Sequence, residues 1–315
     1  IFACAKLVDS LRFSTLYLDN KLLLWWLLLV YVVFFIAARA KASAVFKLGI
    51  PAALSVLTLF LALGMTRLYY NSYDGFITVL DVGQGQSISV FSGENTVMID
   101  CGSIYTTDNA GDRASAYLRG CGRKNIDLLL LTHLHEDHAN GVLRLMAEIP
   151  VKTIALPELP NDDDEQLEEI LAAAEKYGTN LLYVDKNTQL SLGGIELLLY
   201  APGQSGDANE RCVMAKVSLD DYDMLVTGDG SKTAERELME KNDISDVELL
   251  IAGHHGSRYS SCGELLGSIG ADTAVISVGY NTYGHPTNET LERLAAYGYT
   301  IYRTDLNGNV EIRIA

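Results

Sequence analysis

Basic residues are scarce over most of this chain. It holds 24 Lys and Arg against 40 Asp and Glu, and residues 72–315 alone carry a formal charge of −21. A protein that tracks the phosphates of nucleic acid over a broad surface needs clustered Lys and Arg. The shortage excludes a surface of that kind, so any contact with nucleic acid has to be local or supplied by bound metal.

Cysteine pairs with CxxC spacing are also absent. The chain has five cysteines, namely Cys4, Cys101, Cys121, Cys212 and Cys262. Without a CxxC pair, a structural zinc ribbon is excluded. A disulfide is permitted if the soluble part lies outside the cytosol, and the sequence does not choose its partners. Internal repeats, low-complexity tracts and a second soluble domain are not found either.

Charge is missing from two apolar runs near the N-terminus, Leu22 to Ala38 and Leu48 to Met65. Each is close to the roughly 20 residues that cross the hydrocarbon of a bilayer. Trp25 and Trp26 lie near one end of the first run, where interfacial aromatic residues belong. The alternatives are a buried helical hairpin, or a signal peptide for the first run, and the missing initiator Met argues against the signal. We expect residues 1–71 to form a membrane segment with two transmembrane helices.

The connection between the runs predicts their orientation. Residues 39–47 contain Arg39, Lys41 and Lys47 and no acid, which by the positive-inside rule places this loop in the cytoplasm. Arg67 alone argues the other way. We therefore expect a multi-pass protein of the cell membrane with its soluble domain on the extracytoplasmic face. Because the chain begins with isoleucine, it is also expected to be a piece of a longer polypeptide, whose upstream spans influence the topology.

Residues 72–315 predict a layered α/β domain. Short apolar segments alternate with turns and amphipathic helices, a mixture that favours sheet faces packed on each other. The expected strands are 76–81, 87–91, 96–100, 126–131, 195–200, 213–219, 224–227, 247–251, 273–278, 299–303 and 310–314, and the expected helices are 165–177, 232–241 and 289–297.

All six histidines fall in three short segments. They are His133, His135 and His138 in residues 132–141, His254 and His255 in residues 253–257, and His285 before a proline. Histidines placed for packing or for surface solvation would scatter along the chain. The clustering therefore predicts a shared site.

The spacing His-x-His-x-Asp-His has a physical interpretation. It follows an apolar strand, so His133 and His135 point to the same side while the chain is extended, and Asp137 and His138 turn toward a neighbouring point as a helix begins. Imidazole and carboxylate together suit zinc, manganese or iron, bound as one or two divalent ions. The alternative is a hydrogen-bonded polar turn in which Asp137 lies near the helix N-terminus.

Residues 132–141 resemble the signature of the metallo-β-lactamase superfamily. Further segments resemble the C-terminal domain of ComEC-type competence DNA-channel proteins, namely Leu80–Gly85, Ile99–Gly102, Leu225–Asp229, Gly253–Ser257, Ser277–Pro286 and Arg303–Asp305. The match runs from about Phe76 to the C-terminus, with two membrane spans in front. It implies a metallo-β-lactamase αββα sandwich preceded by two transmembrane helices, with residues 72–315 as the hydrolase domain.

The resemblance also implies roles for single residues. Asp229 matches the acid that bridges two metals, alongside His133, His135, Asp137 and His138 as ligands. His254 matches the metal ligand that comes late in the family's sequence. The sequence leaves open whether His255 takes this role instead. Asp100 matches an acid that orients the metal loop, and Asp81 lies in a loop beside the site with the flexible Gly83 and Gly85. Turn capping is the alternative for Asp81 and Asp100.

Two departures from the family pattern bear on the metal. Gln86 stands where the family usually has an acid. Many enzymes of the superfamily also place a ligand histidine between the first cluster and the bridging acid, whereas this chain has no histidine between His138 and His254. Asn209 and Cys212 occupy the comparable region. One metal position is therefore expected to be weakly held, and one or two ions, zinc or manganese, remain open.

The chemistry implied is attack of a metal-activated water on a phosphodiester. Asp137 or Asp229 would orient the water, while His255, Ser257 and His285 would bind phosphate or protonate the leaving oxygen. A turn histidine before a proline is the alternative for His285. The resemblance implies degradation of the DNA strand that is not imported. The expected partners are single-stranded DNA, the upstream channel domain and other competence proteins.

Two other functions compete with this interpretation. The first is a membrane-anchored hydrolase of a small substrate, such as a phosphocholine ester or a lactone, which the acidic composition favours slightly. The second is a metal-binding module of a channel without catalysis, which the complete His-x-His-x-Asp-His run disfavours. Arg119, Arg123 and Lys124 form a small basic group that is a candidate contact for a DNA backbone, or an ordinary solvated loop.

Overall fold

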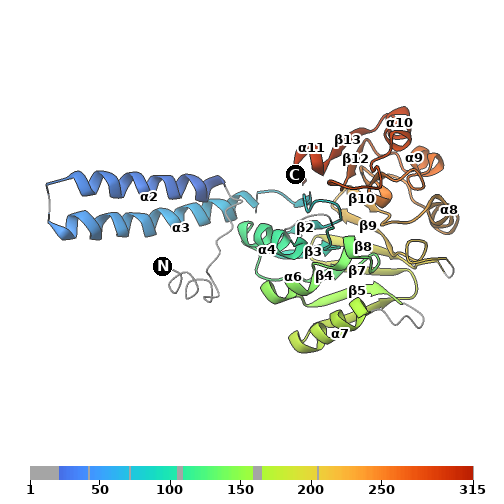
Figure 1. Ribbon diagram of the computed structural model, residues 1–315, viewed down its shortest axis with the longest axis horizontal. Coiled ribbons are helices and arrows are strands. Elements are labelled where there is room, and N and C mark those ends of the chain that lie inside the picture. The colour runs from blue at the N-terminus through green and yellow to red at the C-terminus, as the bar shows by residue number, and fades with distance from the viewer. Residues whose placement is uncertain are drawn as a thin grey trace. The chain divides into compact units, whose positions relative to one another are not determined.

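A computed structural model describes residues 21–41, 43–70, 72–104, 109–158, 165–203 and 206–314. The chain divides into two compact units. The first contains the N-terminal apolar helices together with residues 116–123, and the second contains residues 73–115 and 124–315. Figure 1 shows the helices of the first unit and the sheets of the second.

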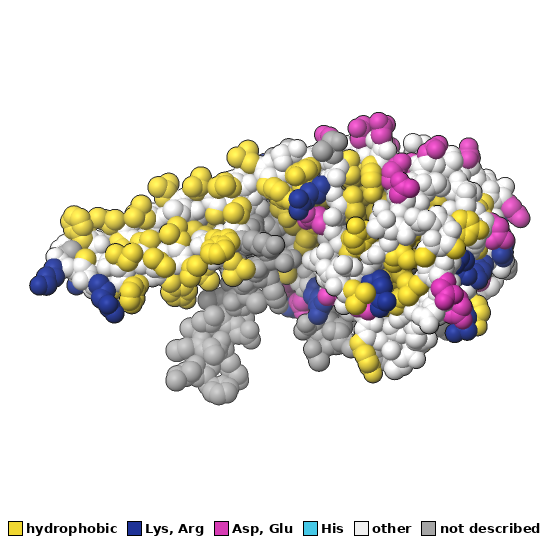
Figure 2. Space-filling model, turned by 90° about the horizontal axis from the view of Figure 1, so that it is seen from above, with side chains coloured by type: hydrophobic (Ala, Val, Ile, Leu, Met, Phe, Trp, Pro, Cys, Tyr) yellow, Lys and Arg dark blue, Asp and Glu magenta, His cyan; other side chains and the backbone are white. Residues whose placement is uncertain are grey.

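The first unit is built on two apolar helices, α2 (Lys21–Arg39) and α3 (Ile50–Tyr70), with the π-helix η1 (Val45–Gly49) leading into α3. In the spans 22–39 and 45–70 the most apolar stretch of 18 residues has a mean hydropathy of 2.3 and 2.1, and only 6% of each stretch is buried, so both are long and apolar enough to cross a membrane. The indole of Trp26 donates to the carbonyl of Ser55 at 3.0 Å and ties the helices together. Apolar side chains cover the pair, and basic ones gather where the helices are joined (Figure 2).

The second unit contains two seven-stranded sheets. The first has the order β14-β1-β2-β3-β4-β5-β6. Its strands are β1 (Gly75–Val79), β2 (Ile88–Ser92), β3 (Asn95–Ile99), β4 (Leu128–Leu130), β5 (Thr153–Pro157), β6 (Asn180–Val184) and β14 (Val310–Ile314). Pairing is antiparallel from β14 to β3 and parallel from β3 to β6.

The second sheet has the order β13-β12-β11-β10-β9-β8-β7. Its strands are β7 (Thr188–Leu192), β8 (Ile195–Tyr200), β9 (Met214–Leu219), β10 (Tyr222–Val226), β11 (Leu249–Ile251), β12 (Thr273–Ile276) and β13 (Thr300–Arg303). Strands β10 to β13 are parallel, so the loops that follow them leave the sheet at one edge.

Helices cover the outer faces of the two sheets (Figure 1). Those of the first half are α4 (Ala110–Gly120), α5 (Glu136–Ala139), α6 (Val142–Glu148) and α7 (Glu165–Tyr177). Those of the second half are α8 (Lys232–Lys241), the 3-10 turn η2 (Gly253–Gly256), α9 (Gly263–Ser268), α10 (Asn288–Ala296) and α11 (Thr304–Asn307). Leu238 of α8, Leu265 of α9 and Leu294 of α10 join the core on the outer face of the second sheet. The expected αββα sandwich is confirmed.

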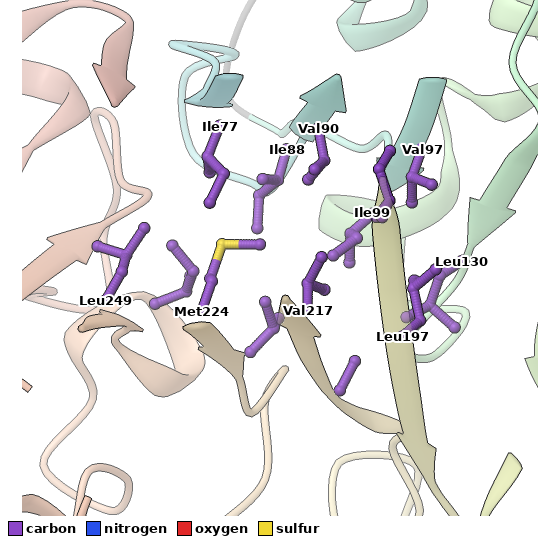
Figure 3. Close-up of a cluster of buried hydrophobic side chains, with 14 of the residues drawn as sticks. Ile77, Ile88, Val90, Val97, Ile99, Leu130, Leu197, Val217, Met224 and Leu249 are labelled. Atoms are coloured by element: carbon purple, nitrogen blue, oxygen red, sulfur yellow. The ribbon is translucent and has the colours of Figure 1, made fainter. Parts of the chain in front are cut away.

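The main core lies between the sheets. Ile77, Ile88 and Ile99 of the first sheet face Val217 and Met224 of the second (Figure 3). All five side chains are inaccessible to solvent, and burial of an aliphatic side chain of this size stabilises a fold by roughly 1.5–3 kcal/mol. The packed strands form the rigid base from which the loops of the site project.

Candidate metal centre

The first histidine segment, residues 132–138, leaves the first sheet just after β4. The chain bends at Thr132, two residues after β4 ends at Leu130, and α5 begins at Glu136. The side chains of His133 and His138 are 1% and 0% exposed. The expected change from strand to helix therefore brings two imidazoles, separated by five positions, into one buried place.

Asp229 lies at the centre of the site. It follows β10, and its side chain is 3% exposed. Its Oδ1 is 3.0 Å from Nε2 of His138 and 3.9 Å from Nε2 of His255. Its Oδ2 is 3.8 Å from Nε2 of His133 and 3.5 Å from Nε2 of His254. One carboxylate thus faces four of the six imidazoles.

The second histidine segment, residues 253–256, forms η2 after β11. His254 and His255 both have left-handed backbone, with φ of 50° and 53°, a conformation that costs a non-glycine residue roughly 1–3 kcal/mol. This turn directs His255 inward. Its Nδ1 is 2.8 Å from the carbonyl of Ser277, and its Nε2 is 3.3 Å from Oδ2 of Asp137. His254 stays 30% exposed, with its ring 5.5 Å from that of His285.

Two groups of side chains place their ligand atoms within 4.8 Å of one another. One contains Asp137, His138, Asp229 and His255, and the other contains His133, His135 and Asp229. Asp229 belongs to both. Within the described part of the chain, His254 and His285 belong to neither group.

The donor atoms of these groups fit divalent metal. Nε2 of His133, His138 and His255 and Oδ1 of Asp229 are buried and make no hydrogen bond to any described residue, a state that costs about 1–3 kcal/mol for each group. Meanwhile Nδ1 of His138 and Nδ1 of His255 are engaged by other oxygens. Nδ1 contacts of this kind turn the Nε2 lone pairs toward a common point, as metal-ligating histidines require.

Asp100 positions the first histidine segment through contacts with Thr132 and His138. Its Oδ1 accepts from the backbone N–H of Thr132 at 2.7 Å, and its Oδ2 accepts from the Thr132 hydroxyl and from Gln86, each at 2.8 Å. Nδ1 of His138 lies 2.8 Å from the same Oδ2. Gln86, which replaces an expected acid, therefore contributes a donor to this buried carboxylate instead of a second negative charge.

Two glycines allow loops to pack directly beneath α5. A Cβ on Gly102 would lie 2.3 Å from the backbone nitrogen of His138. Gly85, with φ of +156°, would place a Cβ 2.2 Å from the carbonyl oxygen of Gly102. Both contacts are with backbone, which cannot move aside. The loop around Gly85 is thus a buried support of the histidine segment.

The charges of the site reinforce one another. Burial lowers the pKa of His133, and the neighbouring His138 lowers it further. Burial opposes protonation of His138 too, but the carboxylates of Asp229 and Asp100 raise its pKa above the usual value. Burial would raise the pKa of Asp137 and Asp229, yet contacts with His255 and His138 hold both pKa values well below normal. Ionised acids beside imidazole nitrogen favour a bound cation.

Asp81 and Asn209 lie outside both groups. Asp81 accepts from the backbone of Gly83 at 3.2 Å and pairs with Arg113 at 3.8 Å, and its side chain is 39% exposed. These are the contacts of a capped turn. The backbone of Asn209 donates to Asp207. Cys212 donates its thiol to the carbonyl of Thr227 at 3.3 Å, and burial raises its pKa.

The cysteines show no disulfide among the described residues. Cys101, Cys212 and Cys262 are buried thiols, and burial raises the pKa of Cys101 and of Cys262 to about 12. Cys4 lies outside the described residues. The disulfide that the sequence permitted is therefore not seen in the part of the chain that can be described.

The metal-binding groups open into a cavity of about 640 Å³. The sequence anticipated Asp137, Asp229, His135, His254, His255, Ser257 and His285 among the residues that line it. It missed Gln84, Ile104, Glu136, Arg258, Tyr259, Tyr283 and Thr287. Arg258 and Tyr259 directly follow Gly253–Ser257, so their position next to a predicted segment could have identified them as lining residues. Among the described residues, Arg119, Arg123 and Lys124 do not line the cavity.

Proteins similar to this chain include competence proteins. ComE operon protein 3 of Bacillus subtilis is 27% identical over 261 residues, covering 77% of this chain and 33% of that protein. Competence protein ComA of Neisseria gonorrhoeae is 29% identical over 240 residues, covering 75% of this chain and 32% of that protein. The chain thus spans about a third of the length of these relatives. The predicted resemblance to competence proteins is confirmed.

The fold is shared with the metallo-β-lactamase fold protein YhfI from Bacillus subtilis, at a TM-score of 0.53 and 14% identity, over 76% of this chain and 99% of that one. The model of the metallo-β-lactamase superfamily matches residues 80–280. Together with the cluster of imidazoles and carboxylates, these findings support a metallohydrolase role. The chain belongs to the metallo-β-lactamase superfamily.

Proposed function

We propose that this protein is a metal-dependent phosphodiesterase that degrades the DNA strand left outside during DNA uptake. The observation that carries the proposal is the arrangement around Asp229. One buried carboxylate joins two groups of ligand atoms at an open cavity that also contains Ser257 and His285. Two adjacent metal positions suit the displacement of an oxygen from phosphate, since both the attacking and the leaving oxygen need stabilisation.

We assign Asp137, His138, Asp229 and His255 to one metal position and His133, His135 and Asp229 to the other. His255 takes the place given to His254 by the family pattern, because its Nε2 is buried and has no hydrogen-bond partner among the described residues. Zinc and manganese both accept imidazole and carboxylate ligands. Bound there, a divalent ion supplies Lewis acidity that polarises a phosphoryl oxygen and makes water more acidic.

The chain's own residues bind and orient the substrate. The carboxylate of Asp137, whose Oδ2 lies 3.3 Å from Nε2 of His255, is placed to accept a hydrogen bond from the attacking water and so to orient it. Ser257 and His254 line the cavity, where each can donate to a phosphate oxygen. Burial lowers the pKa of His285 to about 4. At neutral pH His285 is therefore uncharged, and its role is to hydrogen-bond the leaving oxygen.

The membrane setting of the proposal rests on α2 and α3 and on the relatives. We place both helices in the cell membrane and the hydrolase domain on the extracytoplasmic face, because the loop that joins them is basic. The relatives named for competence and the ComE operon connect the chain with DNA uptake. Single-stranded DNA is the proposed substrate, and the rest of the channel and other competence proteins are the proposed partners.

A small phosphodiester or ester is the second candidate substrate. Arg258 is the one Lys or Arg among the described residues that line the cavity, whereas Glu136, Asp137 and Asp229 are acidic. A compact substrate would need less positive charge than a polymer of phosphates.

The test uses the full chain in detergent, stripped of metal with a chelator and reloaded with manganese or zinc. We expect cleavage of end-labelled single-stranded DNA in the reloaded protein and a return to background in Asp229→Asn. Asp81→Asn, which changes a carboxylate outside the cavity, is the matched control. Turnover of a phosphocholine ester with intact DNA under both metals would favour the small-substrate hydrolase. Metal uptake without turnover of either substrate would favour the non-catalytic module.

A further inference from the structure

Two exposed tyrosines stand at the cavity that holds the metal-binding groups. Tyr259 follows η2, and Tyr283 lies in the loop between β12 and α10; both line the cavity. Tyr259 is 69% exposed and Tyr283 is 56% exposed. Two large rings from distant parts of the chain thus meet solvent at the same opening.

One of the tyrosines, Tyr283, lies next to the ring of a histidine. The ring of Tyr283 is 5.8 Å from that of His285, and the two planes are tilted by 36°. The ring of His285 in turn lies 5.5 Å from that of His254, whose Nε2 is 3.5 Å from Asp229. Aromatic rings therefore lie in sequence from the exposed Tyr283 to His254 beside Asp229, with the two histidine rings meeting edge to face at 82°.

The charge of the cavity limits how a polymer could be held there. Among the described lining residues, Arg258 is the single basic side chain, and it already lies 3.4 Å from Glu289. Phosphate neutralisation by Lys and Arg is thus nearly absent. Aromatic stacking is the other general source of affinity for single strands, and it is worth about 5- to 150-fold in binding for each base.

We propose that Tyr259 and Tyr283 stack the nucleobases that flank the phosphodiester held at the metal-binding groups. The inference rests on the proposed function and adds how its single-stranded substrate is recognised, namely through the faces of unpaired bases. In a duplex the faces of the bases are covered by their neighbours, so the tyrosines would select against it. Every base offers a π face, which makes this recognition independent of sequence.

The experiment compares two oligonucleotides of equal length on the manganese-loaded full chain, one of thymidines and one with abasic sites throughout. We expect the base-bearing strand to have the higher kcat/KM. Tyr259→Leu and Tyr283→Leu, which keep apolar bulk but remove the ring, should each reduce this preference by about 5- to 150-fold. Tyr259→Phe and Tyr283→Phe should retain it. Tyr177→Leu, at a 45% exposed tyrosine of α7, is the control that leaves both rates unchanged.

Equal cleavage of the two strands by the unaltered protein, or a preference that survives both leucine substitutions, would overturn the inference while leaving the phosphodiesterase intact. If neither strand is cleaved, it is the proposed function that fails. Binding of the same labelled strands, measured by fluorescence anisotropy in the same variants, then decides the inference. Tighter binding of the thymidine strand that depends on the two rings supports it, and equal binding contradicts it.

Discussion

The two histidine segments reach the same site by different means. In residues 132–138 the imidazoles lie on a short connection between β4, which ends at Leu130, and α5, which begins at Glu136. In residues 253–256 they are placed by a turn with left-handed backbone at both histidines, which is held from outside by the Ser277 carbonyl. Local spacing thus contributes to the first segment, which Asp100 also holds in place, whereas the second depends mainly on what surrounds it. A strained turn of this kind persists only where its surroundings enforce it.

The largest effect is expected from replacing Asp229, the carboxylate that lies beside both histidine segments. Asp229→Asn keeps the size of the side chain but takes the charge from both ligand groups. Since Lewis-acid stabilisation is worth several kcal/mol, phosphodiester cleavage should fall by about 10³-fold or more. Metal content, measured by mass spectrometry after gel filtration, should fall as well. A variant with full metal content and unchanged activity would show that the segments do not share an ion.

Replacing His254 and His255 one at a time tests which of these adjacent histidines in the second segment binds metal. His255→Ala removes a buried ligand atom, so metal affinity should fall by more than the roughly 10- to 100-fold that loss of an outer partner costs. His254→Ala should leave metal affinity nearly intact and act mainly on substrate binding. Competition against a chelator measures both affinities. The reverse order would assign the ligand role to His254 and contradict the importance of the inward turn.

The support of the first segment is tested through Asp100. Asp100→Asn removes the charge that faces His138 and should reduce metal affinity by about 10- to 100-fold. Gln86→Ala removes one of the donors to the same carboxylate and should have a smaller effect in the same direction. The chelator competition provides the measurement, and circular dichroism checks that both variants fold. An effect of Gln86→Ala larger than that of Asp100→Asn would be inconsistent with support through the carboxylate.

The smallest effect concerns the support near the second segment. Glu235 of α8 is buried and accepts from the backbone N–H groups of Ser261 and Cys262, both at 2.7 Å. Burial raises its pKa from 4.5 to about 7, although those contacts and Arg293 oppose the shift. The folded state therefore binds more protons than the unfolded state between these values. Stability should fall as pH rises from about 4.5 to about 7, by roughly 3 kcal/mol.

Glu235→Gln cannot titrate, so this pH dependence should flatten in the variant. Denaturant unfolding at pH 5 and pH 7 measures it, with Glu237→Gln on the exposed side of α8 as the control. A slope that is the same in Glu235→Gln and in the unaltered chain would assign the pH dependence to other groups.

Much of the fold was predictable because the strands are apolar and turn residues separate them in the sequence. The predicted strands at 195–200 and 310–314 coincide with β8 and β14, and the predicted helices at 165–177 and 232–241 coincide with α7 and α8. Strands β5, β6 and β7 were missed. The sequence of β6 is apolar, yet most of its side chains are not buried, so no alternating pattern distinguished it from a loop. Helices α4, α6, α9 and α11 were also missed, and α9 and α11 are so short that they carry little periodicity.

What the sequence determined by itself is that the first histidine segment follows an apolar strand and precedes a helix, which places its histidines near one another. It also identified Asp229 and Asp100, through a resemblance that residue types and order alone could carry. Only the tertiary structure turned His255 inward while leaving His254 partly exposed, placed Asp81 in a capped turn, and brought Tyr259 and Tyr283 to one cavity. The physical reason is that these outcomes depend on contacts between segments far apart in the chain, on which local spacing has no bearing.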